Sequence, residues 1–227
     1  MTTLLIATRN AHKVSEIRAI LGAQFQFLTL NDFPAAPKVV EDALTFAGNA
    51  AKKAVELAHW IQSSGFKVQG SEFFVLADDS GLEVDALSGA PGIHSARFAA
   101  MDSAKSGNTP DADNNAKLLR HLKDVPLEKR TARFRCVIAL VAVAGGASVS
   151  ASRLVSSLAP PILFDGTCEG RILFATRGKN GFGYDPLFMP LDFEQTFAEL
   201  GDDVKNQLSH RAKALANLKD YFSRLPI

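Results

Sequence analysis

The spacing of apolar residues changes once along the stretch 4–21, and this change constrains the fold more than any other feature of the chain. The run 4–7 is short and wholly apolar, which is typical of a buried strand. A polar stretch follows at 8–12, after which apolar residues recur at helical spacing from Val14 to Leu21, and Gly22 ends the pattern. Strand, polar turn and helix in this order indicate an α/β sheet.

Downstream, the same alternation continues at first, and strands then cluster in the middle of the chain. The patterns predict strands at 25–30, 73–77, 131–144, 151–155 and 171–175, and helices at 43–61, 114–122 and 206–222. Stretches rich in Gly, Pro, Asp and Asn predict turns or loops at 31–41, 78–81, 89–92, 104–113, 145–146, 166–170 and 177–190. We therefore expect an α/β fold with an antiparallel extension, in which 131–144 pairs with 151–155.

Composition excludes several classes of protein. Apolar residues make up 47% of the 227 positions, which is enough to fill a sizeable core. Charged residues make up 22%, and 25 basic against 24 acidic side chains leave a net charge of +1. This balance argues against a disordered chain and against nucleic-acid binding by bulk charge, so we expect no nucleic-acid partner.

The number of cysteines and the lengths of the apolar runs bear on where in the cell the protein is expected. Only Cys136 and Cys168 are present, which excludes a disulfide scaffold and a four-cysteine zinc site and predicts two buried thiols. The longest apolar run, 136–144, falls far short of the roughly 20 residues that a membrane-spanning helix needs. The apolar start at 4–7 is too short for a signal peptide. We expect a cytoplasmic protein without a membrane partner.

The first polar cluster is the stretch 8–13, between the first predicted strand and helix. A helix N-terminus offers unpaired N–H groups and the positive end of a dipole. Thr8 and Asn10 add polar side chains and Lys13 adds a positive charge, so the cluster suits a phosphate group. The Gly-x-x-x-x-Gly-Lys pattern is absent. The alternative is purely structural, with Asn10 as a helix cap and Lys13 solvated.

The second polar cluster is Asp78-Asp79-Ser80-Gly81, directly after the apolar strand 73–77. Two carboxylates at the end of a buried strand are costly unless they are paired or bound to a cation. Mg²⁺ takes one or two carboxylates together with waters and substrate phosphates, and Glu41 is a further oxygen ligand candidate. A carboxylate here is also placed to accept a proton from an attacking water. The alternative is a simple turn closed by Gly81.

Two further clusters follow in the last quarter of the chain. Gly181 to Pro186 contains glycines that allow close backbone approach and aromatic rings on which a base can stack. Lys205 and 209–211 supply hydrogen-bond donors. Each cluster has a structural alternative. The first would be a loop packed into the core, and the second would be an ordinary charged helix start. Together the four clusters supply what is needed to hold a nucleotide with its metal.

Six stretches in this order resemble the inosine triphosphate pyrophosphatases, also called the Ham1-like family, from Leu5 to about Phe222. The stretches are Thr8-x-Asn10-x-x-Lys13, Glu41 ahead of Thr45-Phe46, Leu76 to Leu82, Gly89 to Gly92 with Ser95-Ala96-Arg97, Gly181 to Pro186, and Lys205-Asn206 with Ser209-His210-Arg211. The resemblance implies hydrolysis of ITP, dITP and XTP to the monophosphate and pyrophosphate with Mg²⁺, which clears non-standard purines from the nucleotide pool. It also implies a homodimer, and a single domain over 1–227 with an elongated mixed β-sheet flanked by helices and a nucleotide cleft between two lobes.

The resemblance further implies a role for each matching residue. The phosphate groups are assigned to Thr8, Asn10, Lys13, Lys53, Ser80 and Arg97. The metal is assigned to Glu41 and Asp79, and Asp79 is also the proton acceptor. The base and sugar are assigned to Phe182, Gly183, Tyr184, Asp185, Lys205, His210 and Arg211.

One position departs from the family pattern. Bacterial members usually carry Glu before the Asn-Ala that starts the second helix, and this chain carries Gly48. If that Glu positions water, Glu41 or Asp78 is the substitute here. Two alternatives to the family activity stay open: a nucleotide-binding sensor without turnover, which would not need Asp79, and a related pyrophosphatase of modified pyrimidine triphosphates.

Overall fold

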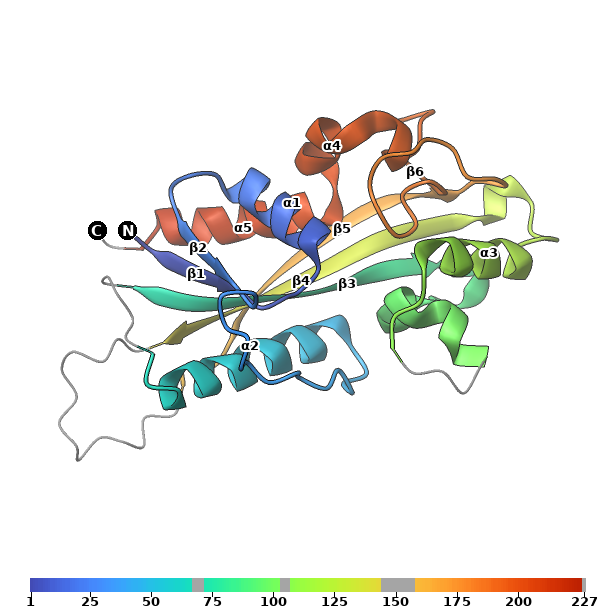
Figure 1. Cartoon of the computed structure of the whole chain (residues 1–227). Helices are drawn as coiled ribbons and strands as arrows, with labels where there is room; N and C mark the ends of the chain where they lie inside the picture. Colours follow the sequence, from blue (N-terminus) through green and yellow to red (C-terminus); the bar gives the residue numbers. More distant parts are fainter. Residues whose placement is uncertain (67–71, 103–106, 144–157, 226–227) are drawn as a thin grey trace. The chain divides into compact units, whose positions relative to one another are not determined.

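The computed structural model describes residues 1–66, 72–102, 107–143 and 158–225. Its strands are β1 (Thr3–Ile6), β2 (Gln26–Thr29), β3 (Phe73–Val84), β4 (Thr131–Val143), β5 (Ile162–Ile172) and β6 (Phe188–Pro190). Its helices are α1 (Ala11–Leu21), α2 (Phe46–Ser63), α3 (Asp111–His121), α4 (Phe197–Leu208) and α5 (His210–Ser223) (Figure 1). Shorter 3₁₀ segments are η1 (Asp85–Leu87), η2 (Gly92–Asp102) and η3 (Leu127–Lys129).

The strands form one six-stranded mixed sheet in the order β2-β1-β3-β4-β5-β6. β1 is parallel to β2 and β3, whereas β6 is antiparallel to β5. This confirms the expected mixed sheet flanked by helices. The predicted partner strand at 151–155 lies outside the described residues.

The chain divides into two compact units. Unit 1 consists of Met1–Asp79, Val137–Phe164 and Asn217–Ile227, and unit 2 consists of Ser80–Cys136 and Asp165–Ala216. The boundaries fall inside β3 and β4, between Phe164 and Asp165 of β5, and between Ala216 and Asn217 of α5. These three strands therefore contribute residues to both units.

Unit 1 begins with two crossover connections that run in opposite directions. The chain passes from β1 to one neighbour, β2, through α1, and then returns past β1 to β3 through α2. Because such crossovers are right-handed, the reversal places the two helices on opposite faces, as Figure 1 shows for α1 and α2. The carboxyl end of β1 thus lies at a reversal of strand order, which is where open α/β sheets bind ligands.

Unit 2 packs around a core cluster of apolar side chains from several elements. Leu82 and Val84 of β3, Leu118 of α3 and Phe188 of β6 are wholly buried in it. The Phe134 ring lies 4.7 Å from the Phe188 ring. The core therefore joins α3 to the strands and fixes the loops between them.

The predicted turn at 78–81 is wrong, because β3 continues through these residues to Val84. Asp78 and Asp79 are 3% and 6% exposed. Asp78 Oδ1 accepts from Lys13 Nζ, and Asp79 Oδ2 accepts from Asn49 Nδ2. Side chains from α1 and α2 thus satisfy carboxylates that would otherwise favour a solvated turn.

The predicted turn at 166–170 is also wrong, because β5 spans 162–172. Of the strand predicted at 171–175, only 171–172 lie in β5. Gly166 and Gly170 serve close packing within the strand instead of turning the chain. A Cβ at 166 would collide with the His210 carbonyl, and one at 170 would collide with the Met189 carbonyl. Glycine in a strand often marks such an approach.

The single closing helix predicted at 206–222 is two helices in the structure. Ser209 between α4 and α5 is extended, with ψ 163, and its Oγ accepts from Ala212 N at 3.2 Å. Serine is a preferred N-cap residue, because its hydroxyl accepts from a backbone N–H of the first helical turn, so Ser209 starts a new helix. Two smaller differences are β6, inside the predicted loop 177–190, and the start of α3 at Asp111.

The prediction for the two cysteines agrees with the structure. Cys136 and Cys168 are both buried thiols. Within the described ranges, we find no helix with the combined length and apolar character needed to cross a bilayer.

Candidate active site

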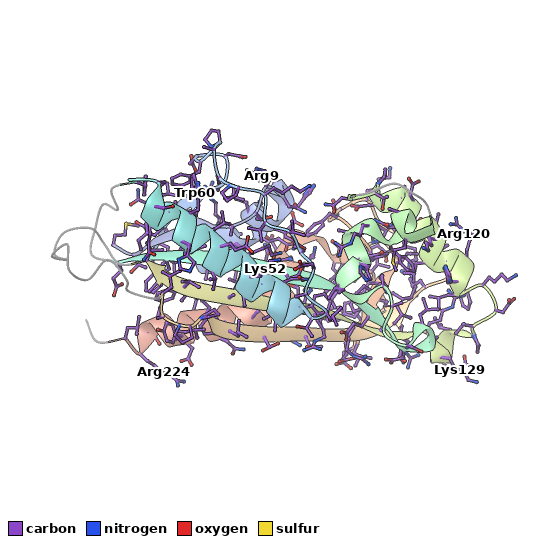
Figure 2. The ribbon with its side chains drawn as sticks, turned by 90° about the horizontal axis from the view of Figure 1, so that it is seen from below. Arg9, Lys52, Trp60, Arg120, Lys129 and Arg224 are labelled. Atoms are coloured by element: carbon purple, nitrogen blue, oxygen red, sulfur yellow. The ribbon has the colours of Figure 1, made fainter. Side chains whose placement is uncertain are left out.

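Unit 1 gathers five charged side chains into one group, which we call the acid–lysine cluster: Lys13, Glu41, Lys53, Asp78 and Asp79. Lys13 lies on α1, Lys53 on α2 and the two aspartates on β3, while Glu41 precedes α2. Figure 2 shows α2 in front, with Lys52 labelled one residue before Lys53. Lys52 itself pairs with the exposed Asp42 at 2.5 Å, outside the cluster.

Each lysine of the cluster contacts carboxylates. Lys13 Nζ lies 2.6 Å from Asp78 Oδ1. Lys53 Nζ lies 3.2 Å from Glu41 Oε1 and 3.6 Å from Asp79 Oδ1, and it donates to the Asp78 carbonyl at 2.7 Å. Burial alone would lower the pKa of Lys53, but Asp79, Glu41 and Asp78 outweigh it and raise that pKa. Lys53 therefore stays charged.

Both oxygens of Asp79 are oriented. Oδ2 accepts from Asn49 Nδ2 at 3.1 Å, and Oδ1 faces Lys53 Nζ. Burial raises the pKa of Asp79, and the positive charges of Lys53 and Lys13 offset this only in part. A held carboxylate with a raised pKa is well suited to accept a proton.

The start of α1 shows the structural role that was considered for Asn10 in the stretch 8–13. Asn10 Oδ1 accepts from His12 N at 2.9 Å and from Lys13 N at 3.2 Å, which makes Asn10 the N-cap. Thr8 Oγ1 accepts from Asn10 N at 3.2 Å. The structural role of Asn10 is thus present, and the cap places Lys13 beside Asp78.

The donor set of the acid–lysine cluster fits a magnesium ion shared with a substrate. Its hard oxygens belong to Glu41, Asp78 and Asp79. Among the described residues, no group of three or more His, Cys, Asp or Glu side chains is placed to hold a metal by itself. Mg²⁺ typically completes such a partial set with waters and substrate phosphates.

Unit 2 gathers a second group, which we call the aromatic–cation cluster: Phe182, Asp185, Lys205 and Arg211. Lys205 Nζ lies 2.5 Å from Asp185 Oδ2 and 4.4 Å from the centroid of the Phe182 ring. Arg211 Cζ lies 5.9 Å from the same centroid. Lys205 and Arg211 are 2% and 1% exposed. One ring is therefore flanked by two buried cations.

The loop that carries Phe182 is held by its own residues. Phe182 N donates to Asp185 Oδ2 at 2.8 Å, the oxygen that also accepts from Lys205. Gly181 has φ 74, and a Cβ there would collide with the Asp185 carboxylate. Glycine at 181 thus allows the backbone to close around Asp185.

Tyr184 and His210 have structural partners in unit 2. Tyr184 OH donates to the Ser95 carbonyl at 2.9 Å, and burial raises the pKa of Tyr184. The His210 ring stacks on Phe134 at 4.8 Å. For both rings the structure supports packing in the core, beside the aromatic–cation cluster.

Ser80 and Arg97 are both in unit 2. Ser80 Oγ accepts from Arg211 Nη2 at 2.8 Å, so this hydroxyl orients a cation of the aromatic–cation cluster. Arg97 is half-buried in η2, where its φ of −130 interrupts the helix. In the described part of the chain, no hydrogen bond or ion pair joins Arg97 to Ser80.

Gly48 lies in the first turn of α2. Its N–H donates to Thr45 Oγ1 at 3.0 Å, and a Cβ would stand 2.8 Å from the Ala43 Cβ. Any side chain at this position therefore requires a local shift. Glu41 and Asp78, the substitutes considered above, are paired with Lys53 and Lys13 respectively.

Asn49 is the residue that the motif analysis missed. It is completely buried, donates to Asp79 and accepts from Ala43 N at 3.0 Å. A signal was present: Asn49 and Lys53 are four residues apart and lie on one helix face among alanines. A polar pair on an otherwise apolar face indicates a buried polar partner.

The chain is similar to known proteins along almost its full length. The model of the Ham1 family matches residues 4–221. A dITP/XTP pyrophosphatase of Desulforamulus reducens is 43% identical, covering 99% of this chain and 97% of that protein. One of Geobacter sulfurreducens is 46% identical, covering 97% and 96%. Among solved structures, a HAM1 protein from Coxiella burnetii matches with a TM-score of 0.75 at 34% identity, over 99% of this chain and 100% of the other.

Proposed function

Because the chain belongs to the Ham1 family, we propose that it hydrolyses ITP, dITP and XTP to the monophosphate and pyrophosphate. This activity would remove non-standard purines from the nucleotide pool. The observation that carries the proposal is Asp79, a buried carboxylate with both oxygens oriented and two lysines beside it. Relatives that are dITP/XTP pyrophosphatases support the substrate class.

The acid–lysine cluster would perform the phosphate chemistry. Lys13 and Lys53 bind phosphate oxygens and stabilise charge as it moves toward the leaving group. Asp79 accepts a proton from the water that attacks the α-phosphorus. A new phosphorus–oxygen bond forms, the bond to the α–β bridging oxygen breaks, and pyrophosphate leaves.

Glu41 and Asp79 would hold Mg²⁺ when substrate is bound. The ion supplies positive charge that offsets the negative charge of the phosphate oxygens. Thr8, Asn10, Ser80 and Arg97 are assigned to the phosphate groups as part of this proposal. A cytoplasmic location and a homodimer stay predictions of the sequence analysis.

The aromatic–cation cluster would bind the base. Phe182 supplies a ring for stacking, and Lys205 and Arg211 supply donors. Hypoxanthine and xanthine carry an acceptor oxygen at ring position 6, whereas adenine carries a donor amino group. Donors in the protein therefore favour ITP and XTP over ATP. Gly183, Tyr184, Asp185 and His210 are assigned to the same base and sugar site.

The proposal is tested with purified protein, a panel of triphosphates and pyrophosphate detection, with Mg²⁺ and with a chelator. We expect pyrophosphate from ITP, dITP and XTP, far less from ATP, and none after chelation. Tight ITP binding without turnover would favour the sensor alternative. Turnover confined to pyrimidine triphosphates would favour the pyrimidine alternative, and either result would overturn the proposal.

A further inference from the structure

Helix α3 carries two side chains that bind both backbone polar groups of Gly183. Gly183 N donates to Asp111 Oδ2 at 2.6 Å, and Asn115 Nδ2 donates to the Gly183 carbonyl at 3.0 Å. Asp111 and Asn115 are four residues apart, so they lie on the same face of α3. We call this pair the α3 clamp.

The residues on either side of Gly183 are each held by a hydrogen bond of their own. Phe182 N is bonded to Asp185, and Tyr184 OH is bonded to Ser95. Gly183 lies between them in a left-handed conformation, with φ 64. The α3 clamp therefore holds the one residue that links the Phe182 ring to the buried Tyr184.

The burial of Asn115 indicates that its hydrogen bond to the Gly183 carbonyl does more than fill space. The side chain is 6% exposed, and in the part of the chain that the structure describes its Oδ1 accepts no hydrogen bond. A buried amide is costly in that state. Its donor bond to the Gly183 carbonyl is thus the contact that justifies a polar side chain at this position.

The attachment of α3 does not depend on the clamp. Asn114 Oδ1 accepts from Ala99 N at 2.8 Å and from Thr109 Oγ1 at 2.7 Å. Leu118 is completely buried in the core of unit 2. Removal of the clamp should therefore release the loop at Gly183 while α3 stays in place.

We infer that Asp111 and Asn115 are positioning residues that fix the Phe182 ring for the purine base. The inference rests on the proposed function, and it adds two side chains that act through Gly183. Without them the loop samples other conformations, and base binding includes the entropic cost of ordering it. The phosphate-binding groups of unit 1 should be unaffected.

The test compares Asp111→Ala and Asn115→Leu with Asp113→Ala. The control removes a carboxylate from the same first turn of α3, where acidic residues interact with the helix dipole, but it leaves the clamp intact. Four quantities are measured: kcat and KM for ITP, the dissociation constant of IMP, the inhibition constant of inorganic tripolyphosphate, and Tm. Tripolyphosphate is the informative probe because it carries phosphates and no base.

We expect KM for ITP and the dissociation constant of IMP to rise about tenfold in both clamp variants, as for loss of a hydrogen bond to a charged or buried partner. The inhibition constant of tripolyphosphate should not change. Asp111→Asn keeps an acceptor oxygen and should recover most of the loss.

Two results would overturn the clamp: ITP and IMP affinities equal to those of Asp113→Ala, or a parallel loss of tripolyphosphate affinity. If the unaltered protein does not hydrolyse ITP, the proposed function fails, and the IMP affinities of the variants still decide the clamp. A protein that neither hydrolyses ITP nor binds IMP overturns both.

Discussion

Asp79 depends on side chains that are far from it in the sequence. Asn49 is 30 residues away and orients one oxygen, while Lys53 faces the other. Burial raises its pKa, which makes the carboxylate a better proton acceptor and a more costly group to bury. The same residue thus combines an expected catalytic role with a cost in stability.

Asp79→Asn should abolish most of the activity and keep the fold. The two side chains are nearly isosteric, and the amide oxygen still accepts from Asn49. We expect kcat for ITP to fall by about 10²–10⁴ or more, because the proton acceptor and a metal ligand are lost together. Asp42→Asn, which removes the exposed pair with Lys52, is the matched control and should keep its activity. Near-normal turnover of Asp79→Asn would remove this residue from the mechanism.

Cys168, in the core of unit 2, should make the free energy of unfolding depend on pH. Burial raises the pKa of its thiol from 9.0 to about 11; Lys213 lowers it and Glu169 raises it to lesser degrees. A raised pKa in the folded state favours the protonated thiol. Its contribution to stability is therefore complete below pH 9 and is lost as the pH rises toward 11.

Urea unfolding of the unaltered protein and of Cys168→Ala over this pH range checks the prediction. The free energy of unfolding should fall less steeply with pH in the variant, because one titrating group has been removed. Equal slopes for the two proteins would show that the thiol does not titrate in this way.

At the scale of elements, β3 marks a limit of prediction from sequence. Asp78 to Gly81 are poor strand residues, and they favour a turn when only their neighbours in the sequence are considered. The strand continues because Lys13, 65 residues away from Asp78, and α2 satisfy the carboxylates. The contact between Lys13 and Asp78 is set by the fold and leaves no signal in the residues next to Asp78.

Other elements show the same division between local and distant causes. β1, α1 and α2 follow their hydrophobic periods, and their predicted bounds lie within three residues of the observed ones. The break at Ser209 was missed because its cap hydrogen bond competes with a helical pattern that continues on both sides. Gly166 favours a turn when only its sequence neighbours are considered, because the packing of the α5 backbone on β5 cannot be inferred from residue order.

The N-cap of α1 allows its structural and functional roles to be separated. Asn10→Ala should lower the free energy of unfolding by about 1 kcal/mol, because His12 N and Lys13 N lose their acceptor. Asn10→Ser restores a capping oxygen and should restore stability. KM for ITP should stay raised in Asn10→Ser if the amide contacts the triphosphate.

Urea unfolding and ITP kinetics of both variants provide the measurement. Recovery of stability and of KM together in Asn10→Ser would mean that Asn10 only caps the helix. No loss of stability in Asn10→Ala would contradict the cap itself.

At the scale of the whole molecule, the two units divide the expected chemistry. Unit 1 contains the acid–lysine cluster, with groups suited to phosphates and a metal. Unit 2 contains the aromatic–cation cluster, with a ring and two buried cations suited to a base. The family match spans 4–221 and so covers both. The motif residues of each cluster were found from sequence, whereas their pairing with Asn49, Asp111 and Asn115 required the structure.

Base selection should depend on Arg211. Its guanidinium donates to Ser80 Oγ and lies near the Phe182 ring. We expect Arg211→Ala to lower kcat/KM for ITP by about 10–100-fold, because a donor to the base is lost, and to lower the ATP value less. Steady-state kinetics with both substrates measure the gap. Arg224→Ala, at an exposed position labelled in Figure 2, is the control. An equal loss for both triphosphates would remove Arg211 from base selection.

The central claim is that water attacks the α-phosphorus of ITP, and the site at which the water oxygen enters the products tests this claim most directly. ITP is hydrolysed by the purified protein with Mg²⁺ in ¹⁸O-labelled water, and the products are analysed by mass spectrometry. Attack at the α-phosphorus predicts one labelled oxygen in IMP and unlabelled pyrophosphate. Label in pyrophosphate, or orthophosphate as the first product, would contradict the account.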